Sequence, residues 1–235
     1  MVGSYNLSLR LQMVGKMVPE GARLADVGTD HAYLPAALLQ EGRIPFAIAA
    51  DLRQGPLASA KSTVQRAGLG GKVAFRLCDG LSGIQPHEVD AVSIAGMGGG
   101  TIADILSAAP WTREKEIPLI LQPMSSIPDL RIWLMHHGYR IVKEDLCREG
   151  DTLYTALLVQ TGTMEQLTQT ELWVGKNVNH SLRGLWLDRW IEKIQRALKG
   201  MEQAQGEEVR AKQQSMEEVY YGLCTMKQEW ELWQQ

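Results

Sequence analysis

The sequence has no long uninterrupted apolar segment. Asp, Arg, Gln or Pro interrupts every apolar run well before the roughly 18 to 20 residues that a membrane-spanning helix needs. The first 18 residues also lack the cationic head, apolar block and small-residue cleavage site of a secretory signal, in that order. We therefore expect a cytoplasmic protein that begins with an amphipathic helix and is not an integral membrane protein.

The sequence also has few cysteines and no excess of positive charge. The three cysteines, Cys78, Cys147 and Cys224, are odd in number and far apart, which excludes a disulfide framework and a CxxC metal or redox site. Lys and Arg number 24 against 27 Asp and Glu, a net charge of -3, so no overall basic field attracts polyanions. We expect no metal, and a nucleic-acid partner would need a local basic patch.

Proline is missing from the last part of the chain. All nine prolines fall between Pro19 and Pro128, whereas five of the seven tryptophans follow residue 170. The 235 residues suffice for one large domain with an appendage. We therefore predict two domains, residues 1–161 and residues 162–235.

The first domain alternates short strand-like runs with helical segments, as parallel sheets with crossover helices do. The predicted strands are 23–27, 46–51, 73–78, 91–95, 119–122, 139–146 and 154–159. The predicted helices between the earlier strands are 33–41, 55–67, 101–108 and 127–137. The last two strands are joined by residues 148–151, which predict a hairpin. The pattern predicts an α/β fold with a seven-stranded, mostly parallel sheet of six parallel strands and one antiparallel strand.

The second domain shows apolar residues at alternating steps of three and four, which is the repeat of a coiled coil. The two series are Leu187, Ile191, Ile194, Leu198 and Met201, then Met216, Val219, Leu223, Met226, Trp230 and Trp233. We predict an antiparallel α-helical coiled-coil hairpin with its turn at residues 203–208. The repeat leaves open whether the helices pair within one chain or between chains.

Three acids lie at the carboxyl ends of three successive predicted strands. Asp26 leads into a turn at Gly28, whose missing side chain lets a ligand approach the backbone before a helix N-terminus. Asp51 ends the next strand, where a carboxylate accepts both hydroxyls of a ribose, and Asp79 follows the third. Each acid alone has the alternative role of a helix cap. Together they indicate a nucleoside ligand at the carboxyl ends of the strands.

The turn itself favours one nucleoside cofactor. Asp30 stands where a dinucleotide-binding turn has its second glycine, and its charge would repel a diphosphate, which disfavours NAD and FAD. Asp26 and Asp30 would instead balance an ammonium or sulfonium, which favours S-adenosylmethionine. After the fourth strand, Gly96, Met97 and residues 98–100 predict a loop that forms a tight wall beside the methyl donor. A flexible loop without chemistry is the alternative.

Several segments together resemble one family. These are Asp26-Val-Gly-Thr-Asp-His-Ala-Tyr-Leu-Pro35, Ala50-Asp51, Gly55-Pro56-Leu57, Cys78-Asp79-Gly80-Leu81, Ile94-Ala95-Gly96-Met97-Gly98-Gly99 and Leu121-Gln122-Pro123, with Leu7-Ser8-Leu9-Arg10-Leu11 before them. The sequence resembles the bacterial tRNA (adenine-22-N1)-methyltransferases over essentially its whole length. The resemblance implies a Rossmann-like class I methyltransferase with a coiled-coil domain, which uses S-adenosyl-L-methionine to methylate N1 of an adenine in the D-arm region of tRNA. The chain departs from the family pattern at Met124 and Cys78.

The resemblance also implies roles for individual residues. Asp26, Gly28, Thr29, Asp30 and His31 would line the methionine part of the cofactor. Asp51 would hold the ribose, Asp79 and Gly80 would lie at the adenine, and Gly96, Met97, Gly98 and Gly99 would border the transferred methyl group. Because the product adenine is positively charged, a nearby carboxylate could stabilise it or help remove a proton from N6. Asp30 is the first catalytic candidate and Asp26 the second.

The remaining candidates concern the RNA. His31 and Tyr33 are candidates for contact with the acceptor base, with helix packing as the alternative. Arg10 clusters with Lys16 and Arg23, and five basic residues mark the first long C-terminal helix: Arg183, Arg189, Lys193, Arg196 and Lys199. Of these, Arg189, Lys193 and Arg196 share one face, which fits phosphate contact, although a solvated face that includes Asp188 and Glu192 is an equal alternative. Other functions left open are methyl transfer to another RNA or a small molecule, and an inactive RNA-binding relative.

Overall fold

The computed structural model describes residues 6–176, 179–201 and 206–234. The chain divides into two compact units, Met1–Met164 and Glu165–Gln235, close to the predicted domain boundary. Each unit is described separately. No helix within the described ranges has the length and apolarity needed to cross a membrane.

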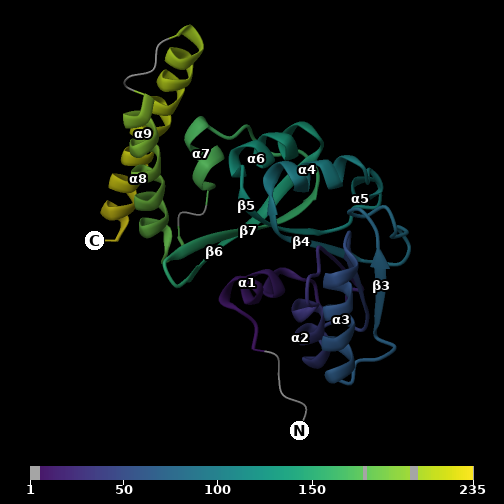
Figure 1. The fold of residues 1–235 in the computed structure, drawn as a ribbon. Helices are drawn as coiled ribbons and strands as arrows, with labels where there is room; N and C mark the ends of the chain where they lie inside the picture. The colour runs from purple at the N-terminus through teal and green to yellow at the C-terminus, as the bar shows by residue number, and fades with distance from the viewer. Residues whose placement is uncertain (1–5, 177–178, 202–205, 235) are drawn as a thin grey trace. The chain divides into compact units, whose positions relative to one another are not determined.

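The first unit is built on one seven-stranded sheet (Figure 1). The strands are β1 (Leu24–Val27), β2 (Ala47–Asp51), β3 (Val73–Leu77), β4 (Ala91–Gly98), β5 (Leu119–Ser125), β6 (Tyr139–Glu149) and β7 (Thr152–Thr161). Their order is β3-β2-β1-β4-β5-β7-β6; the first five pair in parallel, and β7 is antiparallel to both its neighbours. This confirms the predicted sheet and its terminal hairpin, which turns at Gly150 (φ 58°).

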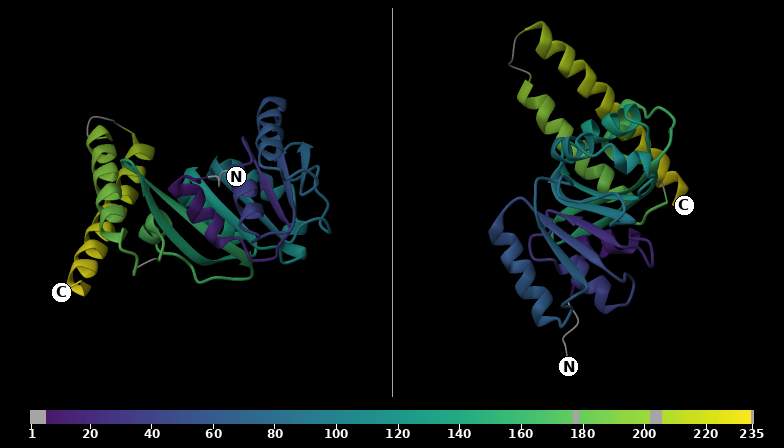
Figure 2. Two further views of the ribbon diagram at one scale, coloured as in Figure 1. Left: turned by 90° about the horizontal axis from the view of Figure 1, so that it is seen from below. Right: turned by 90° about the vertical axis from the view of Figure 1, so that its right-hand side faces the viewer.

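Helices cover both faces of this sheet. They are α1 (Leu9–Met17), α2 (Tyr33–Gln40), α3 (Gln54–Arg66), α4 (Gly99–Ser107), α5 (Trp111–Glu114) and α6 (Ile127–His136). Strand residues alternate between two apolar clusters, because successive side chains of a strand point to opposite faces. Leu24 packs with residues of α1, α2 and α3, and the next residue, Ala25, packs with residues of α4 and α6. The result is a three-layer α/β/α sandwich (Figure 2).

The predicted glycine loop after the fourth strand was wrong. Strand β4 continues to Gly98, with register shifts against β5 at Ala95/Met97 and Met97/Gly98, and helix α4 begins at Gly99. The glycines have a packing role instead, because a Cβ at Gly99 would clash with the carbonyl oxygen of Ser126. The glycines therefore permit tight packing between this strand–helix junction and the β5–α6 connection.

The second unit is helical and contains α7 (Gln169–Val174), α8 (Arg183–Met201) and α9 (Glu207–Trp233). Helices α8 and α9 form the predicted antiparallel hairpin (Figure 1), and residues 203–205 of its predicted turn lie outside the described residues. Leu187, Ile194, Val219 and Leu223 of the predicted apolar series are buried. Trp233, the last of that series, is 77% exposed, so the buried stripe ends before it.

Candidate active site

A cavity of about 540 Å³ lies at the carboxyl ends of β1, β2 and β4. Chain order along the sheet reverses between β1 and β4, since β2 and β3 lie to one side and β4 and β5 to the other. The crevice at such a reversal is where open α/β sheets bind ligands. The lining residues are Ser8, Arg10, Leu11, Asp26, Gly28, Thr29, Asp30, His31, Tyr33, Leu34, Asp51, Arg53, Ala95, Gly96 and Met97.

The turn between β1 and α2 forms one wall and has an unusual backbone. Gly28, Asp30 and Ala32 all have positive φ angles, of 71°, 45° and 54°. Two amides hold the turn to the next strand, because the N–H groups of Gly28 and Thr29 both donate to the carbonyl oxygen of Ala50, at 2.8 and 3.0 Å. Such conformations cost free energy and concentrate at ligand-binding sites.

Gly28 is required for a second reason. A Cβ at this position would clash with Cε of Met97, a residue of β4 that also lines the cavity. The missing side chain thus lets β4 and the turn meet at the cavity wall.

Asp26 is the most enclosed acid of the site. Its carboxylate is 6% exposed and accepts hydrogen bonds from Ser93 Oγ at 2.7 Å and from Thr29 Oγ1 at 2.6 Å. Burial raises the pKa of the Asp26 carboxyl, and the two hydroxyl donors oppose that rise. Asp26 therefore holds the turn in place and presents a small part of its surface to the cavity.

Asp51 ends β2 on the other side of the turn. It is 7% exposed, and its Oδ1 accepts the backbone N–H of Arg53 at 2.8 Å. The guanidinium Nε of Arg53 lies 3.8 Å from the same oxygen, although the Arg53 side chain is 76% exposed. A fixed carboxylate at this point of the cavity has the chemistry to accept a pair of vicinal hydroxyls.

Asp30, His31 and Tyr33 form the more open wall. The Asp30 side chain is 68% exposed, with its Oδ2 3.8 Å from Nε2 of His31. The rings of His31 and Tyr33 stack at 5.1 Å between centroids and 12° between planes. Tyr33 is 39% exposed, so the stacked pair borders the cavity and is accessible to solvent.

Three predicted cofactor residues do not line this cavity. Asp79 is exposed in the turn after β3, and Gly80 (φ 53°) follows it with Ile105 3.0 Å from the position of a Cβ. Gly98 packs toward Ser125 Oγ at the start of α4. The other predicted positions, Asp26, Gly28, Thr29, Asp30, His31, Asp51, Gly96 and Met97, all line it.

Sequence reasoning assigned no role to Gln122, which is fully buried in β5. Its Oε1 accepts hydrogen bonds from Arg10 Nη1 at 2.8 Å and from the Gly96 N–H at 3.1 Å. Both donors belong to cavity-lining residues, one from α1 and one from β4. A polar residue inside an otherwise apolar strand was the signal that could have singled it out.

Two arginines of the predicted basic clusters form hydrogen bonds within the protein and have structural roles. Arg23 binds both carboxylate oxygens of Asp90 at 2.8 Å, and Nη1 of Arg23 also donates to the His87 carbonyl. Arg183 is 2% exposed and donates to the carbonyl oxygens of Val174 and Gly175, at the end of α7, at 2.6 and 3.1 Å. A cation there satisfies carbonyls that the helix leaves unpaired.

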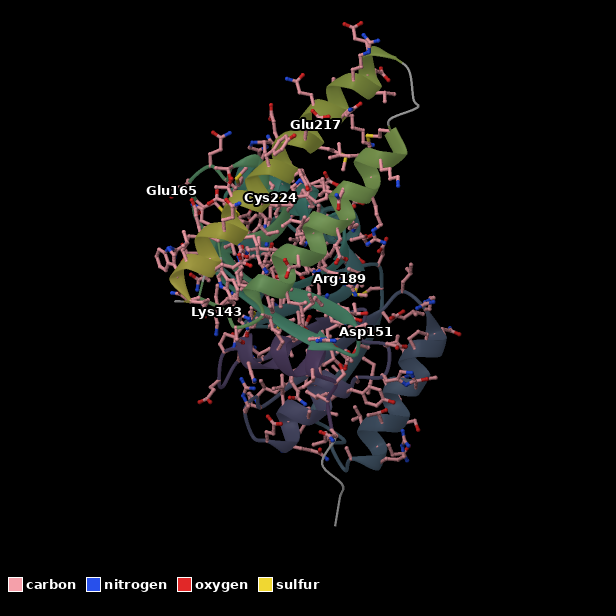
Figure 3. All side chains as sticks on the ribbon, turned by 90° about the vertical axis from the view of Figure 1, so that its left-hand side faces the viewer. Lys143, Asp151, Glu165, Arg189, Glu217 and Cys224 are labelled. Atoms are coloured by element: carbon pink, nitrogen blue, oxygen red, sulfur yellow. The ribbon has the colours of Figure 1, made fainter. Side chains whose placement is uncertain are left out.

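Arg189, Lys193 and Arg196 remain exposed on α8, and Figure 3 labels Arg189. The Lys193 ammonium lies 4.4 Å from the centroid of the Trp190 ring. Asp188, one of the acids interleaved with them, forms an ion pair with Lys227 of α9 at 2.7 Å. The pair offsets one of the two negative charges near this basic face.

Comparisons with known proteins extend over nearly the whole chain. Residues 7–157 match the family model described as a methyltransferase domain. The curated Bacillus subtilis (strain 168) tRNA (adenine(22)-N(1))-methyltransferase is 33% identical over 224 residues, which cover 93% of this chain and 94% of that protein. The chain belongs to the tRNA (adenine(22)-N(1))-methyltransferase family.

Solved structures agree with this family. The crystal structure of the B. subtilis m1A22 tRNA methyltransferase TrmK is 31% identical, with a TM-score of 0.84, and the match covers 95% of this chain and 99% of that one. M. capricolum TrmK, solved with S-adenosyl-homocysteine, is 30% identical with a TM-score of 0.74, and the match covers 91% of this chain and 97% of that one. Because each match covers more than nine-tenths of this chain, it extends beyond the methyltransferase domain into the helical unit.

Proposed function

We propose that this protein transfers the methyl group of S-adenosyl-L-methionine to N1 of adenine 22, in the D-arm region of tRNA. The observation that carries the proposal is the cavity between Asp51 and the β1–α2 turn, in a chain that matches m1A22 methyltransferases along more than nine-tenths of its length. A tRNA substrate also supports the expected cytoplasmic location.

The residues present fit an adenosyl cofactor. The cavity volume of about 540 Å³ lies in the range of about 300–1,000 Å³ that small-molecule sites occupy. Asp51 would accept the ribose hydroxyls, and Gly28 and Gly96 would let the cofactor approach the backbone. Asp26 and Asp30 would supply negative charge for the cationic end. Asp79 and Gly80, which lie outside the cavity, are proposed to meet the adenine at its edge.

The reaction depends mainly on the relative positions of the methyl donor and the acceptor adenine. The bound cofactor supplies an electrophilic methyl group on a sulfonium. N1 of adenine is a neutral nucleophile with its own lone pair, so no residue has to remove a proton before it attacks in line with the methyl–sulfur bond. Holding the two groups in line is then the main contribution of the protein. Gly96 and Met97, at the end of β4, border the space where this contact would occur.

The acceptor adenine must leave its base pair or stack, because N1 lies on the Watson–Crick edge. The exposed pair of His31 and Tyr33 offers a stacking face at the cavity mouth, and His31 also offers a ring nitrogen for hydrogen bonding. Methylation leaves a positive charge on the adenine. The exposed carboxylate of Asp30 would stabilise that charge or accept a proton from N6, with Asp26 as the second candidate.

The RNA body needs contacts beyond this cavity. Arg189, Lys193 and Arg196 form an exposed basic face on α8, and we assign to them the contact with tRNA phosphates. The ion pair between Asp188 and Lys227 supports this assignment because it offsets a neighbouring acid.

The decisive experiment is methyl transfer from labelled S-adenosylmethionine to a bulk bacterial tRNA pool, followed by mapping of the modified nucleoside. We expect N1-methyladenosine at position 22. Transfer to another nucleoside, or no transfer while the cofactor still binds, would contradict the proposed function. Asp30→Asn is the matched variant: it should keep cofactor binding and lower turnover by about tenfold to a hundredfold, as the loss of one electrostatic group does.

A further inference from the structure

The network around Gln122 is not used by the function described above. Gln122 is a fully buried amide in β5, and its single carbonyl oxygen accepts hydrogen bonds from two parts of the cavity wall, Arg10 and Gly96. Its amide nitrogen donates to the carbonyl oxygen of Pro123 at 3.0 Å. A buried polar group with its partners satisfied fixes the positions of those partners.

The hydrogen bond to Gln122 fixes the position of the Arg10 guanidinium. Arginine side chains have large conformational freedom, and in this structure Nη1 is held at 2.8 Å from Gln122 Oε1 while the guanidinium lies 5.8 Å from the centroid of the Tyr154 ring. Within the described ranges, no carboxylate lies within 4.0 Å of this guanidinium. Arg10 is thus an oriented cation at the cavity wall without an ionic partner there.

The charges around the cavity indicate what this cation faces. The other arginine of the lining, Arg53, lies beside Asp51 at the ribose end. Arg10 lies beside Gly96: its Nη1 is 3.4 Å from the place of a Cβ on that glycine. The cavity lining also contains the acids of the β1–α2 turn, Asp26 and Asp30. A cation on one wall and carboxylates on another complement a zwitterionic amino-acid group.

We infer that Arg10 binds the α-carboxylate of the methionine part of the cofactor and that Gln122 is the positioning residue which holds Arg10 there. The inference rests on the proposed function. Guanidinium and carboxylate form strong, directed, charge-assisted hydrogen bonds. The sequence pattern assigned Arg10 to the RNA surface, whereas its contacts with Gln122 place it at the wall of the cofactor cavity.

The test is direct binding by calorimetry to the full-length protein, which does not depend on turnover. Three ligands are compared: S-adenosylhomocysteine, its decarboxylated analogue, and 5′-methylthioadenosine, which lacks the whole amino-acid end. The variants are Arg10→Ala and Gln122→Met, the second chosen because methionine has nearly the volume of glutamine and lacks its strong acceptor. Thermal unfolding checks that each variant folds.

Arg10→Ala should weaken S-adenosylhomocysteine binding about 10- to 100-fold, as loss of a charge-assisted pair does, and leave the other two ligands within about twofold. Gln122→Met should weaken the same ligand by a smaller factor. In an Arg10→Ala background, Gln122→Met should add little, because its effect passes through Arg10. A Gln122 role in folding alone would weaken all three ligands equally and would overturn the inference.

Other outcomes separate the two proposals. Unchanged S-adenosylhomocysteine affinity in Arg10→Ala, with weaker tRNA binding, would assign Arg10 to RNA and overturn this inference alone. Failure of the unchanged protein to bind S-adenosylhomocysteine at all would overturn the proposed function and this inference with it.

Discussion

The charged side chains of the cavity in the first unit and of the basic face of α8 in the second unit differ in exposure to solvent. Asp26 and Asp51 are less than one-tenth exposed, and hydrogen bonds fix both carboxylates: the hydroxyls of Ser93 and Thr29 donate to Asp26, and the Arg53 N–H donates to Asp51. Arg189, Lys193 and Arg196 are exposed on a helix surface. The first arrangement selects a small ligand of defined shape, while the second suits a polyanion whose phosphates can be met in many ways.

The comparison also separates two kinds of arginine. Arg183 in the helical unit is buried and completes the end of α7, whereas its neighbours along α8 face solvent. Arg10 in the first unit is held by a buried amide. Buried acceptors thus fix Arg183 and Arg10, whereas Arg189, Lys193 and Arg196 lie on an exposed helix surface.

The largest effect is expected at the strand–helix junction beside the cavity. Gly99→Ala should lower the free energy of unfolding by about 3 kcal/mol or more, because the new Cβ meets a backbone carbonyl oxygen that cannot move aside. Gly100→Ala is the matched control, since no atom lies within 4 Å of its Cβ position, and it should be neutral or slightly stabilising in the helix. Urea denaturation measures both. Equal losses in the two variants would mean that the junction is not tightly packed.

Charge reversal on α8 tests whether its exposed basic face binds tRNA. Changing Arg189, Lys193 and Arg196 to Glu should weaken tRNA binding about 30-fold or more near physiological salt and flatten its salt dependence, because up to three phosphate contacts are lost. Affinity for S-adenosylhomocysteine should not change. Reversal of Arg210 and Lys212, exposed on α9, serves as a control and should have a smaller effect. A triple variant that binds tRNA normally would show that this face is only solvated.

Gly28→Ala asks whether the cavity wall tolerates a side chain. The variant should bind S-adenosylhomocysteine about tenfold more weakly, because Cε of Met97 must be displaced at the cavity lining. Gly42→Ala has a similar φ, 70° against 71°, with nothing within 4 Å of its Cβ position. Both variants should lose about 1–2 kcal/mol of stability through backbone strain, and only Gly28→Ala should lose affinity. Calorimetric titration of the two proteins decides the matter.

The smallest effect is expected at an exposed ion pair of the first unit. Hydrogen bonding from Arg23 lowers the pKa of Asp90 to about 2 from its ordinary value of 3.8. A depressed carboxyl pKa stabilises the folded state above the unfolded value, so this contribution is present above about pH 4 and is lost as the pH falls toward 2. Asp90→Asn should lower the urea midpoint slightly at pH 7. The difference from the unchanged protein should shrink between pH 4 and pH 2; a constant difference would contradict the linkage.

Much of the first unit follows from local sequence. Short β-branched or Ala-rich runs between helical segments predicted all seven strands, and a glycine after an apolar strand with acids at successive strand ends predicted much of the cavity lining. These features are local because a strand, its turn and the acid that follows it lie within a few residues. The short helices α5 and α7 were missed, since a single turn or two carries little periodicity.

The sequence by itself determined the parallel sheet, the helical hairpin and the chemistry of the turn at Gly28. Only the tertiary structure decided which charged residues remain available: it paired Arg23 with Asp90, buried Arg183 under α7, and brought Arg10 from α1 to Gln122 in β5. The physical reason is sequence separation. Arg10 and Gln122 are 112 positions apart, so no local pattern reports their contact, and only the packed sheet brings them within hydrogen-bond distance.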